Sequence, residues 1–596
     1  MPAFDTTSLR SAAIHVANAP DAPVAFAAAE LQRYVQRLTG LQVPMAHDGM
    51  PNTLVLGAAA PPPPEAPGNT ETFVINPEPS RIILQAGSPR ALLTAVYALL
   101  ERLGCHWSLH GADEEIVPRL DGTVQLDRIE HTARFAVRGY VSDIMTWHYT
   151  QPEYFHDRLD DDRAFIDWMG KSGANAFLYI RHPFDTQLTI PELLPDFQRR
   201  GIDLEYGGHV IPLLLPRELY REHPDYFPAA PDGTRTDHGN LCTSNAAALA
   251  TASANAVQYV REYPEMRVVH IWGADLWHGG WCHCTVCAGV NVQDQSLRVC
   301  NAVARGLAAA GVPRPVCYLA YHDTLDAALS VRPEENVVVE FAPRERCYGH
   351  AINDPACDTN RRYATALERY VELFAGRVRL FEYYGDAILF FGCSVPLGDV
   401  IAADMDYYAR LGVPGVTMLQ FGTYSLWAYP LNFLAFAAAG YGTCVPATVR
   451  RAYCARFAEH AGAVAALFAE VEDLMRGVVT YGDVRRPPRA AAAARRVLAT
   501  VEAALPRLTR RAEQLAACGD DALAAQAALL HYTRAVLAGV RQQLQDTLAG
   551  HPRDAEPLYD AALQVIDAVE RRFKGLWGSV DLPIIHRFFA AAAQSE

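Results

Sequence analysis

The sequence lacks the clustered basic residues by which proteins bind nucleic acid or an anionic membrane surface. Its 67 acidic residues outnumber its 52 lysines and arginines, and its formal net charge is −15. Arginine far outnumbers lysine, but no basic block occurs. Because phosphate groups are neutralised by clustered cations, this composition argues against both kinds of partner.

Export and membrane signals are also missing. No apolar run approaches the roughly 20 residues of a membrane-spanning helix. The start, MPAFDTTSLRSAAIHVANAP, has no charged segment, apolar segment and small-residue cleavage site in the order of a signal peptide. We therefore expect a cytoplasmic protein, with export left open if a leader was removed ahead of this start.

Nucleotide and serine-hydrolase motifs are absent as well. No P-loop, dinucleotide glycine fingerprint or G-x-S-x-G elbow lies between a strand and a helix. The glycine pair in EYGGHVIP (205–212) has no helix start directly after it. We expect no cofactor. The thirteen cysteines are odd in number and scattered, which fits mostly reduced thiols better than a disulfide framework.

The chain is long enough for several domains, and its pattern divides it into three. Residues 1–130 predict a small α/β domain, whose two helices end at Gly40 and Gly104, as helix C-caps do. The proline-rich stretch 60–68 within it predicts a loop. Residues 436–596 are alanine-rich and predict a helical bundle that supports the rest.

Residues 131–435 predict a (β/α)8 TIM barrel. Eight apolar runs alternate with helical stretches, as expected of strands that are buried on both faces. A doubly wound sheet would alternate similarly, but eight units favour closure. The runs are 135–143, 174–182, 202–214, 267–275, 315–323, 336–344, 377–386 and 415–423.

The eight runs begin apolar and end polar. Barrel enzymes place their chemistry at the C-terminal ends of the strands, so these polar residues are the first candidates for a site. They are Asp143, Arg181, His182, His209, Asp275, His322, Arg344, Glu382, Tyr384 and Gln420.

The stretch HIWGADLWHGGWCHCTVC (270–287) is the most distinctive segment. Its Gly-Ala-Asp strand end, the W-C-x-C-x-x-C that follows and DQSLRVCNAVARGL after it resemble the domain of unknown function 4838. The first domain resembles the small N-terminal domain of α-glucuronidases and β-hexosaminidases. The resemblance implies a carbohydrate-active barrel, since part of this group is glycoside hydrolase family 163, endo-β-N-acetylglucosaminidases acting on complex N-glycans.

Three tryptophans, Trp272, Trp277 and Trp281, surround one carboxylate in this stretch. Indole faces stack on the apolar faces of sugar rings, which predicts the wall of a sugar pocket. The alternative is that each tryptophan packs under a loop.

The three cysteines of the stretch, Cys282, Cys284 and Cys287, could with His278 or His283 supply four ligands for tetrahedral zinc. A second C-x-x-C pair is missing nearby, so a Cys284–Cys287 disulfide or buried thiols are the alternatives. We expect the cysteines to be structural, fixing a loop beside the pocket.

Glycoside hydrolysis needs a carboxylic acid to protonate the leaving oxygen and a second group at the anomeric centre. Asp275 and Glu382 are the predicted pair, because they end the fourth and seventh strands of the barrel, and retaining barrel hydrolases commonly use these strands. Glu340, at the end of the sixth strand, is the substitute. Assistance by a substrate acetamido group typically uses two adjacent carboxylates after strand four, and Ala274 precedes Asp275 here.

Further strand-end residues are predicted to bind substrate. Tyr384 is preferred to Tyr383, because side chains alternate along a strand and Glu382 is taken to point inward. Arginine could bind an acidic sugar, although Arg344 could instead pair Glu340 or Glu345, and His322 could be a barrel histidine. The predicted binding residues are Trp272, Trp277, Trp281, Tyr321, His322, Arg344, Tyr384, Arg181, Asp143 and Gln420.

These residues favour a retaining glycoside hydrolase, and the resemblance implies a β-linked, N-acetylglucosamine-containing glycan as its substrate. An exo-acting hydrolase of a uronic acid and a catalytically silent carbohydrate-binding barrel stay open. A metal-dependent enzyme using His182, His209, His322 and Asp275 is a fourth hypothesis, although no local H-x-H or E-x-x-H supports it. Homo-oligomerisation is left open.

Overall fold

The computed structural model of the chain describes most of its residues. The described ranges are 3–5, 12–17, 21–45, 53–57, 69–78, 81–109, 111, 114–120, 122–142, 152–180, 191–276, 279–326, 328–420, 426, 428–478, 487–552 and 564.

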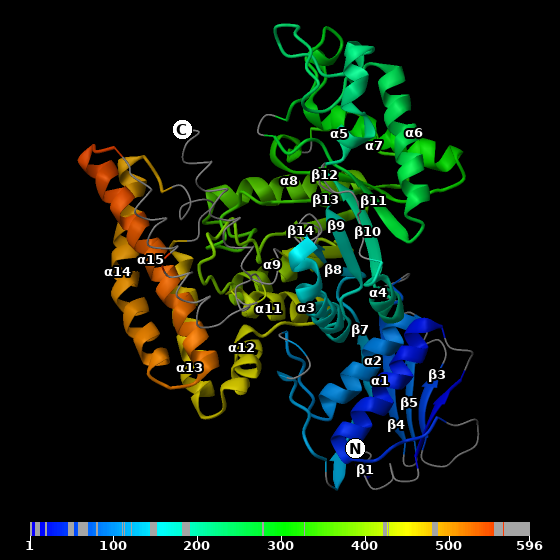
Figure 1. Cartoon of the computed structure of the whole chain (residues 1–596), viewed down its shortest axis with the longest axis vertical. Coiled ribbons are helices and arrows are strands. Elements are labelled where there is room, and N and C mark those ends of the chain that lie inside the picture. Colours follow the sequence, from blue (N-terminus) through cyan, green and yellow to red (C-terminus); the bar gives the residue numbers. More distant parts are fainter. Residues whose placement is uncertain are drawn as a thin grey trace.

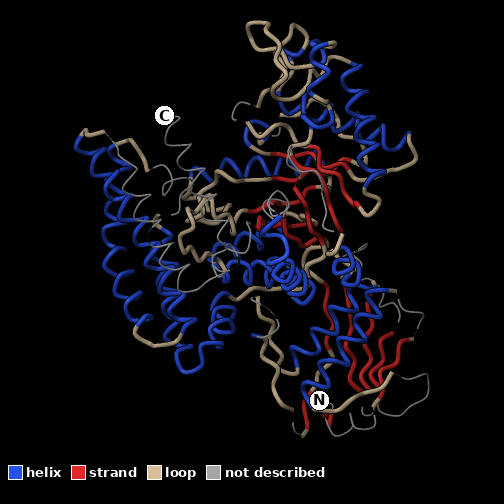
Figure 2. Tube along the Cα trace, viewed as in Figure 1, coloured by secondary structure: helices blue, strands red, loops and turns tan. Residues whose placement is uncertain are grey.

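A closed barrel of eight parallel strands forms the centre of the molecule (Figures 1 and 2). The predicted TIM barrel is confirmed, and the doubly wound alternative is wrong, because the last strand pairs with the first over Gly415–Gln420 and Val137–Ser142. The strands are β8 (Val137–Ser142), β9 (Ala176–Ile180), β10 (Asp203–Gly208), β11 (Met266–Ile271), β12 (Val316–Ala320), β13 (Val337–Phe341), β14 (Val378–Glu382) and β15 (Gly415–Gln420).

Helices follow most of the strands and pack around the barrel, whereas the described residues between β12 and β13 form only a short 3-10 helix, η7 (His322–Thr324). Asparagine side chains cap two of the helices: Asn245 accepts from the backbone at the start of α6, and Asn291 does so at the start of α7. The helices are α3 (Pro152–Lys171), α4 (Leu194–Arg200), α5 (Ile211–Leu214), α6 (Ala246–Glu262), α7 (Val292–Ala309), α8 (Asp358–Phe374), α9 (Gly398–Arg410) and α11 (Pro430–Tyr441).

The N-terminal region forms a separate sheet with its own core, at the lower right of Figure 1. Its order is β2-β3-β5-β4-β7, and helices α1 (Ala22–Thr39) and α2 (Pro89–Arg102) pack on it. The strands are β2 (Ala13–Val16), β3 (Thr53–Gly57), β4 (Thr72–Glu78), β5 (Arg81–Ala86) and β7 (Ile129–Thr132), with β1 (Ala3–Asp5) and β6 (Thr123–Gln125) paired apart. The sequence pattern did not predict β1, β6 and β7, which are too short to show alternation.

The C-terminal region is helical throughout its described residues, as predicted. Its helices are α12 (Pro446–Cys454), α13 (Ala461–Arg476), α14 (Ala491–Ala516) and α15 (Asp521–Ala549), and α14 and α15 form a long hairpin at the left of Figure 1. Tyr532 of α15 donates to the carbonyl of Phe391 over 2.8 Å, and Thr533 accepts from Ser394 N over 2.9 Å. The hairpin therefore supports the loop between β14 and α9. No helix in the described part of the chain is long and apolar enough to span a membrane.

The barrel interior contains a buried polar network below the strand ends. His270 lies between two carboxylates, with Nε2 at 2.8 Å from Glu205 and Nδ1 at 3.1 Å from Glu340. Arg379 donates to Glu205 over 2.6 Å. Although burial alone would raise the pKa of Glu205, Arg379 and His270 lower it to about 2. The positive charge of Arg379 and the hydrogen-bonded His270 thus compensate the buried carboxylates of the network.

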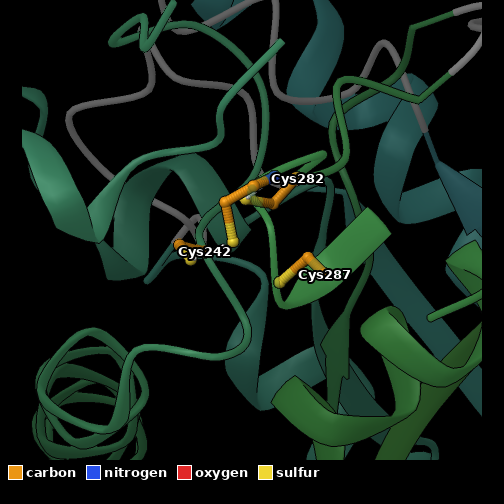
Figure 3. A group of neighbouring side chains, drawn as sticks. Cys242, Cys282 and Cys287 are labelled. Atoms are coloured by element: carbon orange, nitrogen blue, oxygen red, sulfur yellow. Dashed lines mark hydrogen bonds between the residues drawn. The ribbon is translucent and has the colours of Figure 1, made fainter. Parts of the chain in front are cut away.

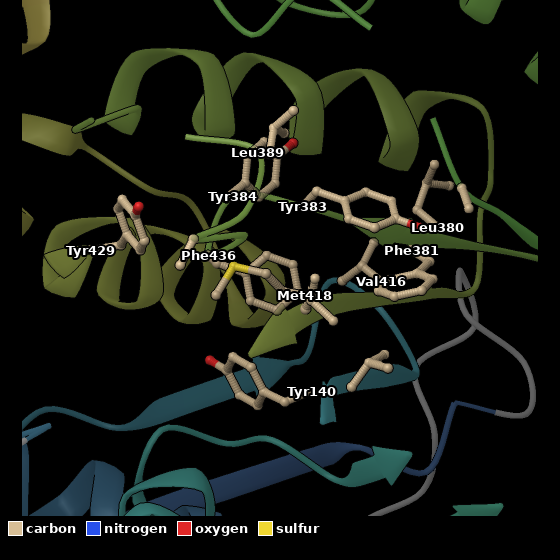
Figure 4. Close-up of a cluster of buried hydrophobic side chains, with 14 of the residues drawn as sticks. Tyr140, Leu380, Phe381, Tyr383, Tyr384, Leu389, Val416, Met418, Tyr429 and Phe436 are labelled. Carbon is tan, nitrogen blue, oxygen red and sulfur yellow. The ribbon is translucent and has the colours of Figure 1, made fainter. Parts of the chain in front are cut away.

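An aromatic and aliphatic layer fills the space between the barrel and its covering helices. Figure 4 includes Tyr140 of β8, Met418 of β15 and Phe436 of α11 in this layer. Large side chains from different elements therefore keep neighbouring strands and helices in a fixed relation.

Candidate active site

The ends of three neighbouring strands, β10, β11 and β12, bring aromatic and polar side chains together. His209, after β10, has its Nδ1 at 2.5 Å from the carbonyl of Gly273, after β11. Its ring packs edge-on against Trp272 at 5.4 Å and lies 6.3 Å from the Tyr321 ring. These contacts define the middle of the candidate site at the C-terminal face of the barrel.

Two carboxylates contact one histidine at this face. His322 Nδ1 lies 2.5 Å from Glu345 Oε1, and His322 Nε2 lies 3.9 Å from Asp275 Oδ1. The side chain of Asp275 is 60% exposed, whereas that of Glu345 is 12% exposed. Residues from the loops after β11, β12 and β13 therefore converge on one point of the barrel rim.

The backbone at His322 is unusual. Its φ is 47°, in the left-handed region that residues other than glycine rarely adopt. Strain of this kind costs on the order of 1–3 kcal/mol and persists where the surrounding structure holds it, often at functional sites. The conformation supports the interpretation of His322 as a site residue rather than a core histidine.

Asn240 holds the segment that carries Asp275. Its Oδ1 accepts from Ala274 N over 2.7 Å, and its Nδ2 donates to the carbonyl of Gly279 over 2.5 Å. Gly279 and Gly280 have φ values of 64° and 55°, which glycine adopts at low cost. Asn240 is buried, so the two ends of the loop around Asp275 are fixed by one side chain.

The tryptophans differ from the predicted open wall. Trp272 is 1% exposed and its ring stacks on Phe381 at 6.1 Å, so it forms the floor of the site. Trp281 is buried beneath the loop, against Gly273 and Gly279. For these two residues the packing interpretation holds, and Trp277 lies outside the described residues.

Glu382 does not face the site, and this corrects the predicted pair. Its carboxylate is completely buried; it accepts from Tyr408 of α9 and lies 3.4 Å from Arg346. Asp404 of α9 binds the same guanidinium. Glu382 therefore points away from the barrel axis toward the helix layer. It does not lie where the second carboxylate of the predicted retaining pair would have to be.

Side chains at the end of β14 do alternate between the two faces of the strand, as predicted. The faces are the reverse of those predicted, because Glu382 and Tyr384 point outward and Tyr383 points toward the site. Tyr384 is buried and donates to Asp404 over 2.7 Å, on the same side as Glu382. Tyr383 packs on Phe381 with 4.6 Å between ring centroids (Figure 4). The guanidinium of Arg344 lies over the Tyr383 ring. Tyr383, and not the predicted Tyr384, lies on the side of the site.

The remaining predicted residues are placed as follows. Glu340 belongs to the buried network, where Thr417 donates to it over 2.9 Å, so it lies below the rim. Arg344 binds Asp386 over 3.0 Å, and Tyr321 borders the site through His209. Gln420 ends β15 and is buried. Asp143, Arg181, His182 and His278 lie outside the described residues.

Cys282, Cys284 and Cys287 lie close together in the segment that follows Asp275, and their structural role stays a prediction. A fourth cysteine, Cys242, joins them and was not among the predicted ligands. Glu345 was not predicted as a site residue either, and Asn240 was missed entirely. Glu345 had a signal, because it is a carboxylate directly after the polar end of the sixth strand, but it was weighed only as a partner of Arg344.

The buried position of Glu382 predicts a pH effect on stability rather than on chemistry. Burial, with Asp404 nearby, raises the pKa of Glu382 from 4.5 to about 7, against the opposing effect of Arg346. The folded state therefore holds this proton more tightly than the unfolded state, so the contribution to stability is lost as pH rises from about 4.5 to about 7. We expect Glu382→Gln to reduce that loss.

The measurement is urea unfolding of wild type and Glu382→Gln at several pH values between 4.5 and 8. Glu334→Gln serves as the control, because Glu334 forms an exposed pair with Arg305. A pH dependence that is unchanged in Glu382→Gln would contradict the assignment.

The fold and the rim residues define a (β/α)8 barrel with a carboxylate site at its C-terminal face. The chain belongs to the family described as domain of unknown function (DUF4838), whose sequence profile matches residues 112–429. A search of curated proteins finds no match.

Several solved structures of similar fold are glycoside hydrolases. A family GH115 4-O-methyl-α-glucuronidase, BtGH115A, with specificity for decorated arabinogalactans, is 14% identical, with 97% of this chain and 78% of that chain covered and a TM-score of 0.60. A GH138 enzyme targeting pectin rhamnogalacturonan II is 10% identical, with 94% of this chain and 74% of that chain covered and a TM-score of 0.57. Flavobacterium johnsoniae chitobiase (FjGH20) is 11% identical, with 97% of this chain and 95% of that chain covered and a TM-score of 0.50. At these identities the likeness establishes the fold.

Proposed function

We propose that the protein is a glycoside hydrolase in which Asp275 and Glu345 are the catalytic carboxylates and His322 is the positioning residue between them. The observation that carries the proposal is the convergence of these three side chains at the ends of β11, β12 and β13. The glycoside hydrolases among the structures of the same fold support the reaction class.

The exposure of the two carboxylates suggests their roles. Asp275, the more exposed, is the acid that protonates the departing glycosidic oxygen. Glu345, which His322 orients, is the base that takes a proton from the attacking water. The bond from the anomeric carbon to the leaving oxygen breaks as the bond to the water oxygen forms.

The proposed roles imply inversion at the anomeric carbon, because Glu345 activates a water and does not itself attack the sugar. Retaining pairs are about 5–5.5 Å apart, whereas inverting pairs are about 6.5–9.5 Å apart and leave room for a water. Asp275 and Glu345 lie near different nitrogens of the His322 ring.

Proton NMR of the first product tests this. We expect the anomer opposite in configuration to the cleaved bond, observed before mutarotation. A first product of retained configuration would contradict the water-activating role of Glu345 and would favour attack by a substrate acetamido group.

The proposed substrate is a glycan that contains β-linked N-acetylglucosamine, cleaved internally. This assignment follows from the resemblance to the endo-β-N-acetylglucosaminidases of glycoside hydrolase family 163, and the chitobiase of similar fold is consistent with it. A second candidate is an exo-acting hydrolase of a uronic acid, favoured by the similarity to the α-glucuronidase. Arg344 at the edge of the site is already bound to Asp386, so an acidic sugar would have to compete for it.

Mass spectrometry of products from a panel of N-glycans and uronic-acid oligosaccharides tests the function. Wild type should release a reducing-end fragment larger than one sugar from an N-glycan. Release of single uronic acids would support the second candidate. Binding without cleavage of any member would contradict hydrolysis and favour a carbohydrate-binding barrel.

A further inference from the structure

Four cysteines from two loops form a compact cluster. Figure 3 shows three of them, Cys242, Cys282 and Cys287, close together. Cys242 lies in the segment between α5 and α6, and Cys282, Cys284 and Cys287 lie in the segment between β11 and α7. Their four sulfur atoms all lie within 4.8 Å of one another. Three of the residues are buried and Cys284 is partly buried.

We propose that Cys242, Cys282, Cys284 and Cys287 bind one structural zinc ion in tetrahedral geometry. Zinc lies about 2.3 Å from each thiolate sulfur in such sites, so the sulfurs of a regular tetrahedron are about 3.8 Å apart. The Cys242 and Cys284 sulfurs are 3.8 Å apart. A disulfide bond would need about 2.05 Å.

Donors around the sulfurs are arranged so that they can stabilise thiolates. Ala229 N and Cys284 N approach the sulfur of Cys282 at 3.4 and 3.5 Å. The Ser244 hydroxyl lies 3.2 Å from Cys242 and 3.5 Å from Cys284. Backbone N–H groups would keep these contacts if the thiols lose their protons on metal binding.

Thiolates are the form of cysteine that binds zinc. The backbone N–H groups and the Ser244 hydroxyl that surround the sulfurs can donate hydrogen bonds to that form.

The cluster differs from the ligand set considered from the sequence, which combined three cysteines with His278. Cys242 supplies the fourth sulfur from a loop that is distant in the chain. Within the described residues a second group, Cys347, His350 and Cys357, also brings cysteine and histidine together, but it offers three ligands and His350 is exposed. The four-sulfur group is the more complete site for zinc.

Zinc at this cluster would join the two loops that form one side of the candidate active site. Asn240, which holds the loop of Asp275, precedes Cys242 in the same loop. The ion would therefore fix the position of Asp275 without touching the substrate. This role is independent of which glycan is cleaved.

The first test is metal analysis of the full-length wild-type protein, purified under reducing conditions with zinc in the growth medium. Elemental analysis should find one zinc per chain, and zinc X-ray absorption should fit four sulfur neighbours at about 2.3 Å. Absence of zinc, a shell of mixed nitrogen and sulfur, or a Cys242–Cys284 disulfide in peptide mass spectra would overturn the proposal.

The second test compares Cys242→Ser with Cys357→Ser, which belongs to the three-ligand group. Cys242→Ser should lose the zinc, and Cys357→Ser should retain it. The opposite pattern would overturn the proposal. Because both readouts are metal content, failure of the proposed hydrolase activity would leave them interpretable, and the absorption spectrum of the wild type decides the question even if Cys242→Ser does not fold.

Discussion

Replacing Asp275 by asparagine is expected to lower kcat on a natural glycan by about 10²–10⁴-fold, the usual contribution of a general acid. Asparagine keeps the size of the side chain but cannot deliver a proton to the leaving oxygen. Glycan binding should change little, because the carboxylate is at the rim and does not hold the fold. The measurement is kcat and Kd for wild type and variant on the same cleaved glycan.

A substrate with a good leaving group sharpens this prediction. An aryl glycoside whose phenol leaves without protonation needs no acid, so Asp275→Asn should cleave it at a rate much closer to wild type. Asp326→Asn is the matched control, because Asp326 is an exposed aspartate after the next strand, paired with Arg362. If Asp275→Asn lowers kcat equally on the glycan and on the aryl glycoside, the role of Asp275 as the general acid is contradicted.

Replacing Glu345 by glutamine is expected to lower kcat by about 10²–10⁴-fold on the glycan and on the aryl glycoside alike. The reason is that the water still has to be activated whichever group leaves. Steady-state kinetics on both substrates checks it. Glu382→Gln is the matched control: its carboxylate is buried against α9, so activity should remain near wild type once folding is verified.

If Glu382→Gln loses turnover while Glu345→Gln keeps it, the assignment of the second carboxylate is contradicted. A loss in both variants would require thermal unfolding to be compared, because Glu382 shares Arg346 with Asp404 in a buried cluster. Normal melting of an inactive Glu382→Gln would count against the account.

The barrel could be predicted from the sequence because its strands are buried on both faces. Runs such as 336–344 are nearly continuous in apolar residues, and the helices between them are long enough to show their period. The three short N-terminal strands could not be predicted, since three or four residues carry no readable alternation.

The site was harder to predict because side-chain direction depends on register at the strand end. Asp275 and His322 were predicted and lie together, with Asp275 in an exposed loop. The sequence pattern predicts that Glu382 points inward, and a shift of one residue in register reverses the direction of Glu382, Tyr383 and Tyr384 together. Glu345 belongs to a loop, where no period indicates direction.

The cysteine cluster shows a different limit of prediction from sequence. The motif around Cys284 lacks a second nearby pair, and Cys242 stands alone in its loop. The pairing of β10 with β11 and backbone hydrogen bonds such as Asn240 N to Gly280 O bring the two loops side by side. A ligand set that is split between consecutive β/α units cannot be recognised from local spacing.

The most direct test of the account is a crystal structure of Asp275→Asn bound to an intact glycan that the wild type cleaves. We predict the scissile oxygen within about 2.6–3.2 Å of the residue 275 side chain, with a water held by Glu345 on the opposite face of the sugar. A glycan whose scissile bond lies away from the Asp275, His322 and Glu345 group would contradict it.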